Sequence, residues 1–175
     1  FSLFGASLVL LYLISSVYHM MPTDSRAKNI FARLDRAMIY ILIAGTYTPI
    51  MLIPLHGALG ITAVSIIWAL AFIGVLIYLL FAHLKWWVPA ILFALIIALD
   101  MTTFFPVKSA LPSEGFWLLL AGSIFYGFGI LVFGASHLSL ARYIPRLAQY
   151  DIGHYFVIAG SATHFVLMFN YVLYL

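Results

Sequence analysis

A few residues of this sequence can bind a metal ion or react with a polar bond, and their spacing suits helices. Ser15 and His19 stand four residues apart, Asp35 follows His19 by sixteen residues, and His154 opens the last apolar segment. Because residues i and i+4 lie on one face of a helix, Ser15 and His19 should share a face. Imidazole and carboxylate groups are common zinc ligands. The pattern therefore favours a metal site, provided that the fold gathers these residues.

Each group in such a site would have its own chemical role. A catalytic zinc ion keeps one position open for water and lowers the pKa of that water to about 7. A carboxylate such as Asp35 can orient the water or act as general base, and the Ser15 hydroxyl can stabilise a developing oxyanion. The simpler alternative is that these polar residues sit at helix ends, face lipid headgroups and need no ligand. Each histidine alone favours that alternative, whereas the set together favours a site.

The composition indicates that the elements positioning these residues are membrane helices. The chain has 175 residues, of which 66% are hydrophobic and 7% charged, and its mean hydropathy is +1.15. Soluble domains carry about 25% charged residues, and a soluble protein of this size could not bury so much apolar surface. Alternating ten-residue strands are absent from the sequence, so a β-barrel is not expected. We predict a single all-α integral membrane domain over residues 1–175.

Six segments are long enough to cross a hydrocarbon core of about 30 Å. The sequence Pro-Leu-His-Gly at 54–57 separates two of them within a run, 37–84, that has no Lys, Arg, Asp or Glu. The chain starts within an apolar segment, so we expect a further helix to precede it. The chain has no cysteine, which excludes thiolate ligands and disulfides. The predicted helices lie near residues 2–21, 36–54, 60–83, 86–106, 116–140 and 153–175.

The basic residues predict the orientation of these helices. With six alternating crossings, Lys108 alone falls on one face, and the other seven fall on the opposite face. Basic loops are retained in the cytoplasm, so we expect this face to be cytoplasmic and the C-terminus to lie outside. His19, Asp35 and His154 all fall at the cytoplasmic face. The net charge of +3 is therefore a topology signal and indicates no nucleic-acid partner.

These residues also resemble a known family. Ser15-x-x-x-His19 with Leu34-Asp35, the run Ala-Gly-Thr-Tyr-Thr-Pro at 44–49, and the last segment from His154 are similar to the bacterial hemolysin III proteins, within the progestin and adipoQ receptor family. The resemblance covers essentially the whole chain. It implies a seven-helix protein of the bacterial inner (plasma) membrane, with the first helix absent here. It also implies a zinc ion near the cytoplasmic face, held by three histidines, with an aspartate linked to it through water.

Mapped onto this chain, the resemblance makes His19 the first zinc ligand, Asp35 the water-linked carboxylate, Ser15 the nearby hydroxyl and His154 the final ligand. The family's last helix usually contains His-x-x-x-His, and this chain has Tyr150 at the first of these positions. Tyrosine has an ordinary pKa near 10 and is a rarer ligand. Tyr150 or Asp151 would complete the site, or the site is weakened or empty.

A second histidine of the last segment, His164, lies ten residues beyond His154. This spacing places it about 15 Å deeper, which is too far to share one ion. We therefore expect His164 to form a hydrogen bond between helices.

Three functions remain open at this point, and so does the question of whether the chain is an enzyme. The first is a zinc-dependent intramembrane hydrolase that cleaves a lipid amide or ester. The second is a non-catalytic protein that senses or regulates the state of membrane lipids, with a structural or lost metal site. The third is a pore-forming hemolysin, against which stands the absence of a continuous polar stripe on any predicted helix. Membrane lipids are the expected partners in each case, and the sequence leaves the oligomeric state open.

Overall fold

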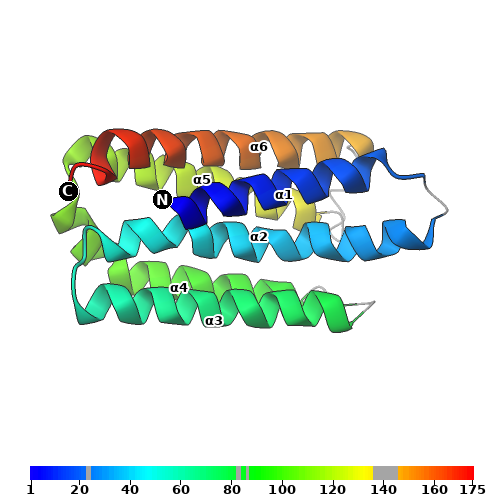
Figure 1. The fold of residues 1–175 in the computed structure, drawn as a ribbon, viewed down its shortest axis with the longest axis horizontal. Helices are drawn as coiled ribbons and strands as arrows, with labels where there is room; N and C mark the ends of the chain where they lie inside the picture. Colours follow the sequence, from blue (N-terminus) through cyan, green and yellow to red (C-terminus); the bar gives the residue numbers. More distant parts are fainter. Residues whose placement is uncertain (23–24, 82–83, 86, 136–145) are drawn as a thin grey trace. The chain divides into compact units, whose positions relative to one another are not determined.

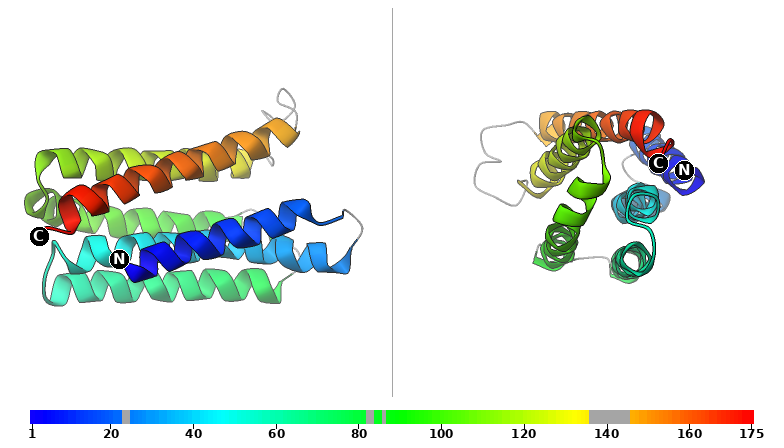
Figure 2. Two further views of the ribbon diagram at one scale, coloured as in Figure 1. Left: turned by 45° about the horizontal axis from the view of Figure 1, so that its top comes forward. Right: turned by 90° about the vertical axis from the view of Figure 1, so that its left-hand side faces the viewer.

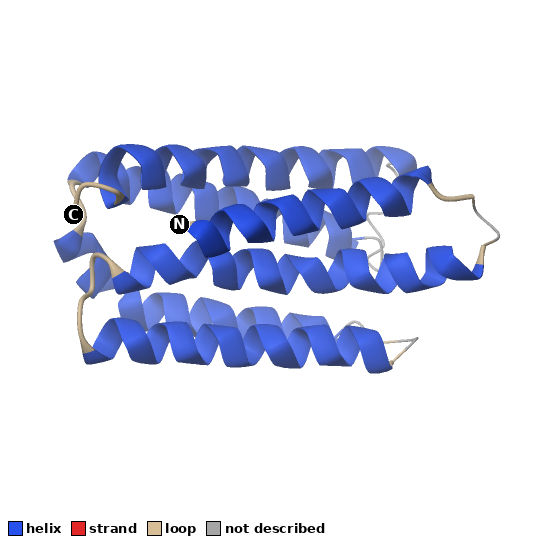
Figure 3. Cartoon of the chain, in the orientation of Figure 1, coloured by secondary structure: helices blue, strands red, loops and turns tan. Residues whose placement is uncertain are grey.

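The computed structural model describes residues 1–22, 25–81, 84–85, 87–135 and 146–175. Helices make up nearly all of these residues, and no strand occurs among them (Figures 1 and 3). The prediction of an all-α fold is therefore confirmed. The helices are α1 (Ser2–Met20), α2 (Arg26–Leu52), α3 (Ala58–Leu80), α4 (Trp87–Ala110), α5 (Ser113–Ala135) and α6 (Arg146–Leu167), and a π-helical turn, η2 (Met168–Val172), follows α6.

Five of the described helices are long and apolar enough to cross a membrane: α1, α3, α4, α5 over Ser113–Phe133, and the last helix over Asp151–Val172. The exception is α2, whose first half carries Arg33, Asp35 and Arg36. However, α2 packs along both α1 and α3, and it lies between them (Figure 2). A helix packed along two membrane-spanning neighbours crosses the bilayer with them. The chain is therefore a multi-pass integral membrane protein.

The contacts divide the chain into two compact units, residues 1–107 and residues 108–175. The first contains α1, α2, α3 and most of α4. The second contains the end of α4 with α5, α6 and η2. The prediction of a single domain stays a prediction.

Two helices begin well before their predicted starts. α2 starts at Arg26 rather than near residue 36, and α6 starts at Arg146 rather than near residue 153. The predicted limits followed the apolar runs, but helices continue into polar sequence where good helix formers such as Ala27 and Lys28 occur. Ser25 caps α2, because its hydroxyl accepts a 3.1 Å hydrogen bond from the Lys28 N–H. Asp35 and His154 consequently lie more than two turns inside their helices rather than at the helix starts.

The predicted break at residues 54–57 is confirmed. α2 ends at Leu52 and α3 begins at Ala58, with Gly57 as the residue that caps α3. Gly57 has a φ of +78°, a conformation that side chains with a Cβ rarely adopt. The glycine therefore permits the sharp reversal that lays α3 back along α2.

Small residues bring the helices of the first unit into close contact. A Cβ added to Gly45 of α2 would collide with Ser7 Oγ of α1 and would lie 3.0 Å from the Leu3 carbonyl oxygen. A Cβ added to Gly74 of α3 would lie 2.7 Å from the ring of Tyr40. The ring of Phe93 in α4 also stacks on the ring of Tyr40, at a centroid distance of 5.1 Å. These contacts set the register of α2 against its neighbours.

We predict that Gly45→Ala destabilises the protein, because Ser7 cannot turn away from the added methyl group without giving up the 2.7 Å hydrogen bond from its hydroxyl to the Phe4 carbonyl. Overpacking of this kind costs about 1–3 kcal/mol. The measurement is the melting temperature of the detergent-solubilised protein. Gly5→Ala is the matched control, since no atom lies within 4 Å of a Cβ at that position of α1. Equal melting temperatures for the two variants would contradict the prediction.

Candidate functional site

The predicted hydroxyl, Ser15, belongs to the buried face of α1. Its companions there are Phe4, Ser7 and Leu11, which are spaced three or four residues apart and all buried. Such spacing places all four residues on one side of a helix. Ser7 contacts Gly45, so this side faces α2. His19 follows one turn after Ser15, and its exposed imidazole makes an edge contact with the ring of Tyr18 at 4.8 Å.

The contact between Ser7 and Gly45 fixes the depth of the predicted site residues. From Ser7 to Ser15 is eight residues, or about 12 Å along α1. From Gly45 back to Asp35 is ten residues, or about 15 Å along α2 in the same direction, because the two helices are antiparallel (Figure 1). Asp35 therefore lies at nearly the depth of Ser15 and within one turn of the depth of His19. The helix packing brings these three residues to one level of the first unit.

The rotation of α2 turns Asp35 toward α1. Lys28 precedes Asp35 by seven residues, which is two helical turns, so the two side chains share a face. The Lys28 ammonium donates a 2.9 Å hydrogen bond to the Met21 carbonyl, directly after α1, and lies 5.5 Å from the ring centroid of Tyr18. Asp35 is half-buried on this face, and no hydrogen bond or ion pair joins its carboxylate to any residue that the structure describes. It is thus an acceptor that remains available to a ligand.

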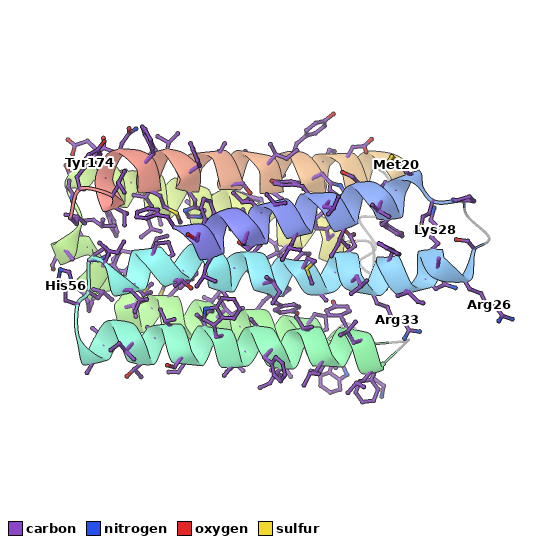
Figure 4. The ribbon with its side chains drawn as sticks, viewed as in Figure 1. Met20, Arg26, Lys28, Arg33, His56 and Tyr174 are labelled. Carbon is purple, nitrogen blue, oxygen red and sulfur yellow. The ribbon has the colours of Figure 1, made fainter. Side chains whose placement is uncertain are left out.

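The arginines near Asp35 point away from it. The Arg33 guanidinium donates a 3.5 Å hydrogen bond to the carbonyl of Leu79, near the end of α3, and that of Arg36 lies 5.7 Å from the ring centroid of Tyr78 (Figure 4 labels Arg33). Cations are favourable at the carboxyl ends of helices, where carbonyl groups are unpaired. These contacts hold the two arginines on the α3 side, so neither neutralises Asp35.

The remaining predicted ligands lie in the second unit. His154 stands eight residues inside α6, half-buried, with its imidazole edge-on to the ring of Phe133 of α5 at 5.3 Å. Asp151 lies one turn earlier and is exposed. Tyr150 belongs to α6 by its backbone, and its side chain lies outside the described residues. The first turns of α6 therefore carry one imidazole and one carboxylate.

The donor types suit zinc, but each unit holds only part of a set. Zinc takes three or four protein ligands, mostly His, Cys and carboxylate side chains. His19 and Asp35 come from one unit, and His154 and Asp151 come from the other. Over the described ranges, no group of three or more His, Cys, Asp or Glu side chains gathers closely enough to hold a metal ion. The zinc site therefore stays a prediction.

A polar cluster that sequence reasoning described only in part lies where α5 crosses α6. The Tyr126 hydroxyl and Ser161 Oγ share a 3.0 Å hydrogen bond, and the His164 ring packs against that of Tyr126 at 5.0 Å. His164 is fully buried, and its Nδ1 has no hydrogen-bond partner among the described residues. The hydrogen bond between helices was predicted for His164, but Tyr126 and Ser161 form it. Gly122, one turn before Tyr126, lies at the same crossing.

Gly122 makes the crossing possible, because a Cβ there would lie 2.7 Å from two ring atoms of His164. We predict that Gly122→Ala lowers the melting temperature in detergent, since the buried ring has to shift at a cost of about 1–3 kcal/mol. The control is Gly127→Ala in the same helix, where a Cβ meets no atom within 4 Å. A Gly127→Ala variant that melts as low as Gly122→Ala would show that general helix effects, rather than this contact, are responsible.

The sequence pattern of the family described as "Haemolysin-III related" matches residues 1–165. "Hemolysin-3" of Bacillus cereus is 36% identical over 173 residues, which cover 99% of this chain and 75% of the relative. "Hemolysin-3 homolog" of Bacillus subtilis (strain 168) is 34% identical over 171 residues, covering 98% of this chain and 76% of the relative. The human "Monocyte to macrophage differentiation factor" is 26% identical over 173 residues, covering 97% and 68%. No solved structure matches the chain.

Proposed function

The chain belongs to the haemolysin-III related family of membrane proteins, and on that premise we propose that it is a zinc-dependent hydrolase of a lipid amide or ester. The observation that carries the proposal is the Asp35 carboxylate. It faces α1 at the depth of the buried Ser15 hydroxyl, one turn from His19, and it has no partner in the described part of the chain. Unpaired acidic groups in membrane helices mark functional sites by default.

In this proposal the imidazoles of His19 and His154 would hold the ion, with Tyr150 or Asp151 as a further ligand. Asp35 would interact with the ion through water, as the family resemblance implies. The bound ion would supply a water molecule that loses its proton near neutral pH. The basic residues of α2 and of the loops support a cytoplasmic location for this end of the protein, with the C-terminus outside.

The protein's own residues then have separate tasks. Asp35 orients the water and accepts its proton as the oxygen attacks the carbonyl carbon of the lipid. The Ser15 hydroxyl donates a hydrogen bond to the oxyanion that forms. The leaving amine or alcohol takes up the proton that Asp35 holds. The acyl chains of the lipid would reach the site directly from the bilayer, along the apolar outer faces of the helices.

Two other functions have specific support. The tyrosine at position 150, where the family resemblance leads one to expect histidine, favours a non-catalytic protein that senses or regulates membrane lipids and has a structural or lost metal site. The names of the two Bacillus relatives favour a pore-forming hemolysin. Measurements of zinc content and lipid turnover distinguish both functions from a hydrolase. Ion leakage from liposomes that carry the purified protein tests pore formation.

We predict that the purified protein holds about one zinc ion per chain, and that His19→Ala and His154→Ala each remove most of it, because zinc needs three or four ligands. Asp35→Asn should weaken zinc binding only about 10–100-fold, as is typical of a group beyond the direct ligands. Elemental analysis of detergent-purified protein is the measurement. The control is His56→Ala, an exposed histidine in the loop between α2 and α3. Full zinc content in His19→Ala would refute the assignment.

We further predict that the wild-type protein releases fatty acid from a ceramide or an ester lipid and that Ser15→Ala slows the release about 100-fold or more at unchanged zinc content, as removal of an oxyanion donor does. Mass spectrometry of the released fatty acid is the measurement. Ser65→Ala is the control, because Ser65 is an exposed serine of α3 whose hydroxyl bonds only its own helix, at the Ile61 carbonyl. Bound zinc without any turnover of these lipids would support the sensor instead.

A further inference from the structure

The first turns of α2 extend past the end of α3 (Figure 1). The guanidinium of Arg33 reaches Leu79, so Arg33 marks the level at which α3 ends. Arg26 precedes Arg33 by seven residues and therefore lies about 10 Å farther out. The headgroup layer extends roughly 5–8 Å beyond each side of the hydrocarbon core. Counted from the level of Arg33, these turns of α2 thus pass through the headgroup layer to its outer surface, where α3 no longer covers them.

One face of this extension combines basic and apolar side chains. Arg26, Ile30 and Arg33 are spaced four and three residues apart, so they share a face of α2. Arg26 is exposed and points away from the helices (Figure 4), and Ile30, a large apolar residue, is 58% exposed. An exposed isoleucine between two arginines suits the boundary between headgroups and acyl chains. We call the face formed by Arg26, Ile30 and Arg33 the overhang face.

On the overhang face, no acidic residue of this segment balances the positive charges. Residues 26–36 contain four basic residues and one acidic residue. The acidic residue, Asp35, lies on the α1 side with Lys28 and therefore not on the overhang face. Within the described residues, Arg26 has no hydrogen-bond or ion-pair partner, and Arg33 contacts only a neutral carbonyl. Both guanidinium groups retain donors that can bind a phosphate.

We infer that the overhang face binds the headgroup of an acidic phospholipid, with Arg26 and Arg33 on the phosphate and Ile30 between them, against the glycerol and ester region of the lipid. A lipid is favoured over a free anion because the exposed Ile30 side chain adds apolar surface that only a lipid can cover. The inference does not depend on the proposed hydrolase site, since Asp35 and His19 lie on the other side of α2. It gives the helix that carries Asp35 a second anchor in the membrane.

The test titrates the full-length chain, purified in a neutral detergent, with short-chain phosphatidylglycerol and follows the melting temperature. We expect the acidic lipid to raise the melting temperature and short-chain phosphatidylcholine to raise it much less. One basic residue near a membrane surface contributes about a fivefold change in affinity for acidic lipid. Arg26→Gln should therefore raise the phosphatidylglycerol concentration for half of the effect about fivefold, without changing the melting temperature in detergent alone.

A matched variant controls for the loss of one positive charge, and matched ligands separate lipid binding from anion binding. Lys108→Gln removes the same charge from the far end of α4 and should leave the titration unchanged. Ile30→Ser should weaken the response to the lipid and have no effect on a response to free anion. The inference is overturned if Arg26→Gln and Lys108→Gln behave alike, if the two lipids act equally, or if inorganic phosphate alone reproduces the shift.

Discussion

The close approach of α1 and α2 is the contact on which the candidate site depends. Inside a bilayer, lipid tails are as apolar as the side chains, so helices associate through packing and polar contacts rather than through the hydrophobic effect. Gly45 leaves the space that Ser7 and the Leu3 carbonyl occupy. Because this contact sets the register of the two helices, it also sets the depth of Ser15 relative to that of Asp35. Both residues lie about two to three turns from the contact. A shift of one residue along α2 would rotate Asp35 away from α1.

Lys28, Arg33 and Arg36 stabilise the same register from the other end. Basic residues at a membrane face determine the orientation of helices, and here they also make structural contacts. Lys28 contacts the carboxyl end of α1, and Arg33 contacts that of α3. These basic side chains are therefore not merely solvated at the helix ends. They connect α2 to both neighbours, and they leave Asp35 without a cationic partner in the described part of the chain.

The second unit uses its polar groups differently. Glycines at 122 and 160 let α5 and α6 approach, and Tyr126 with Ser161 provides a hydrogen bond between the helices. His164 is pressed against Gly122, and its Nδ1 lacks a partner among the described residues. The spacing of His164 from His154 led us to predict a hydrogen bond from His164 to another helix. It could not identify the partners, because the choice between serine and histidine depends on the rotation of α6 against α5.

The sequence by itself determined the class of the protein, its helical segments and its family, because composition, apolar runs and short motifs are local properties. It also placed Ser15 and His19 on one helix face, since a helix has a fixed period. The tertiary structure alone decided where α2 and α6 begin, which neighbour Asp35 faces and which carbonyl groups bind the basic side chains. These features depend on contacts between segments far apart in the chain, such as Gly45 with Ser7 and Arg33 with Leu79. No local pattern specifies a register that side chains on two different helices set together.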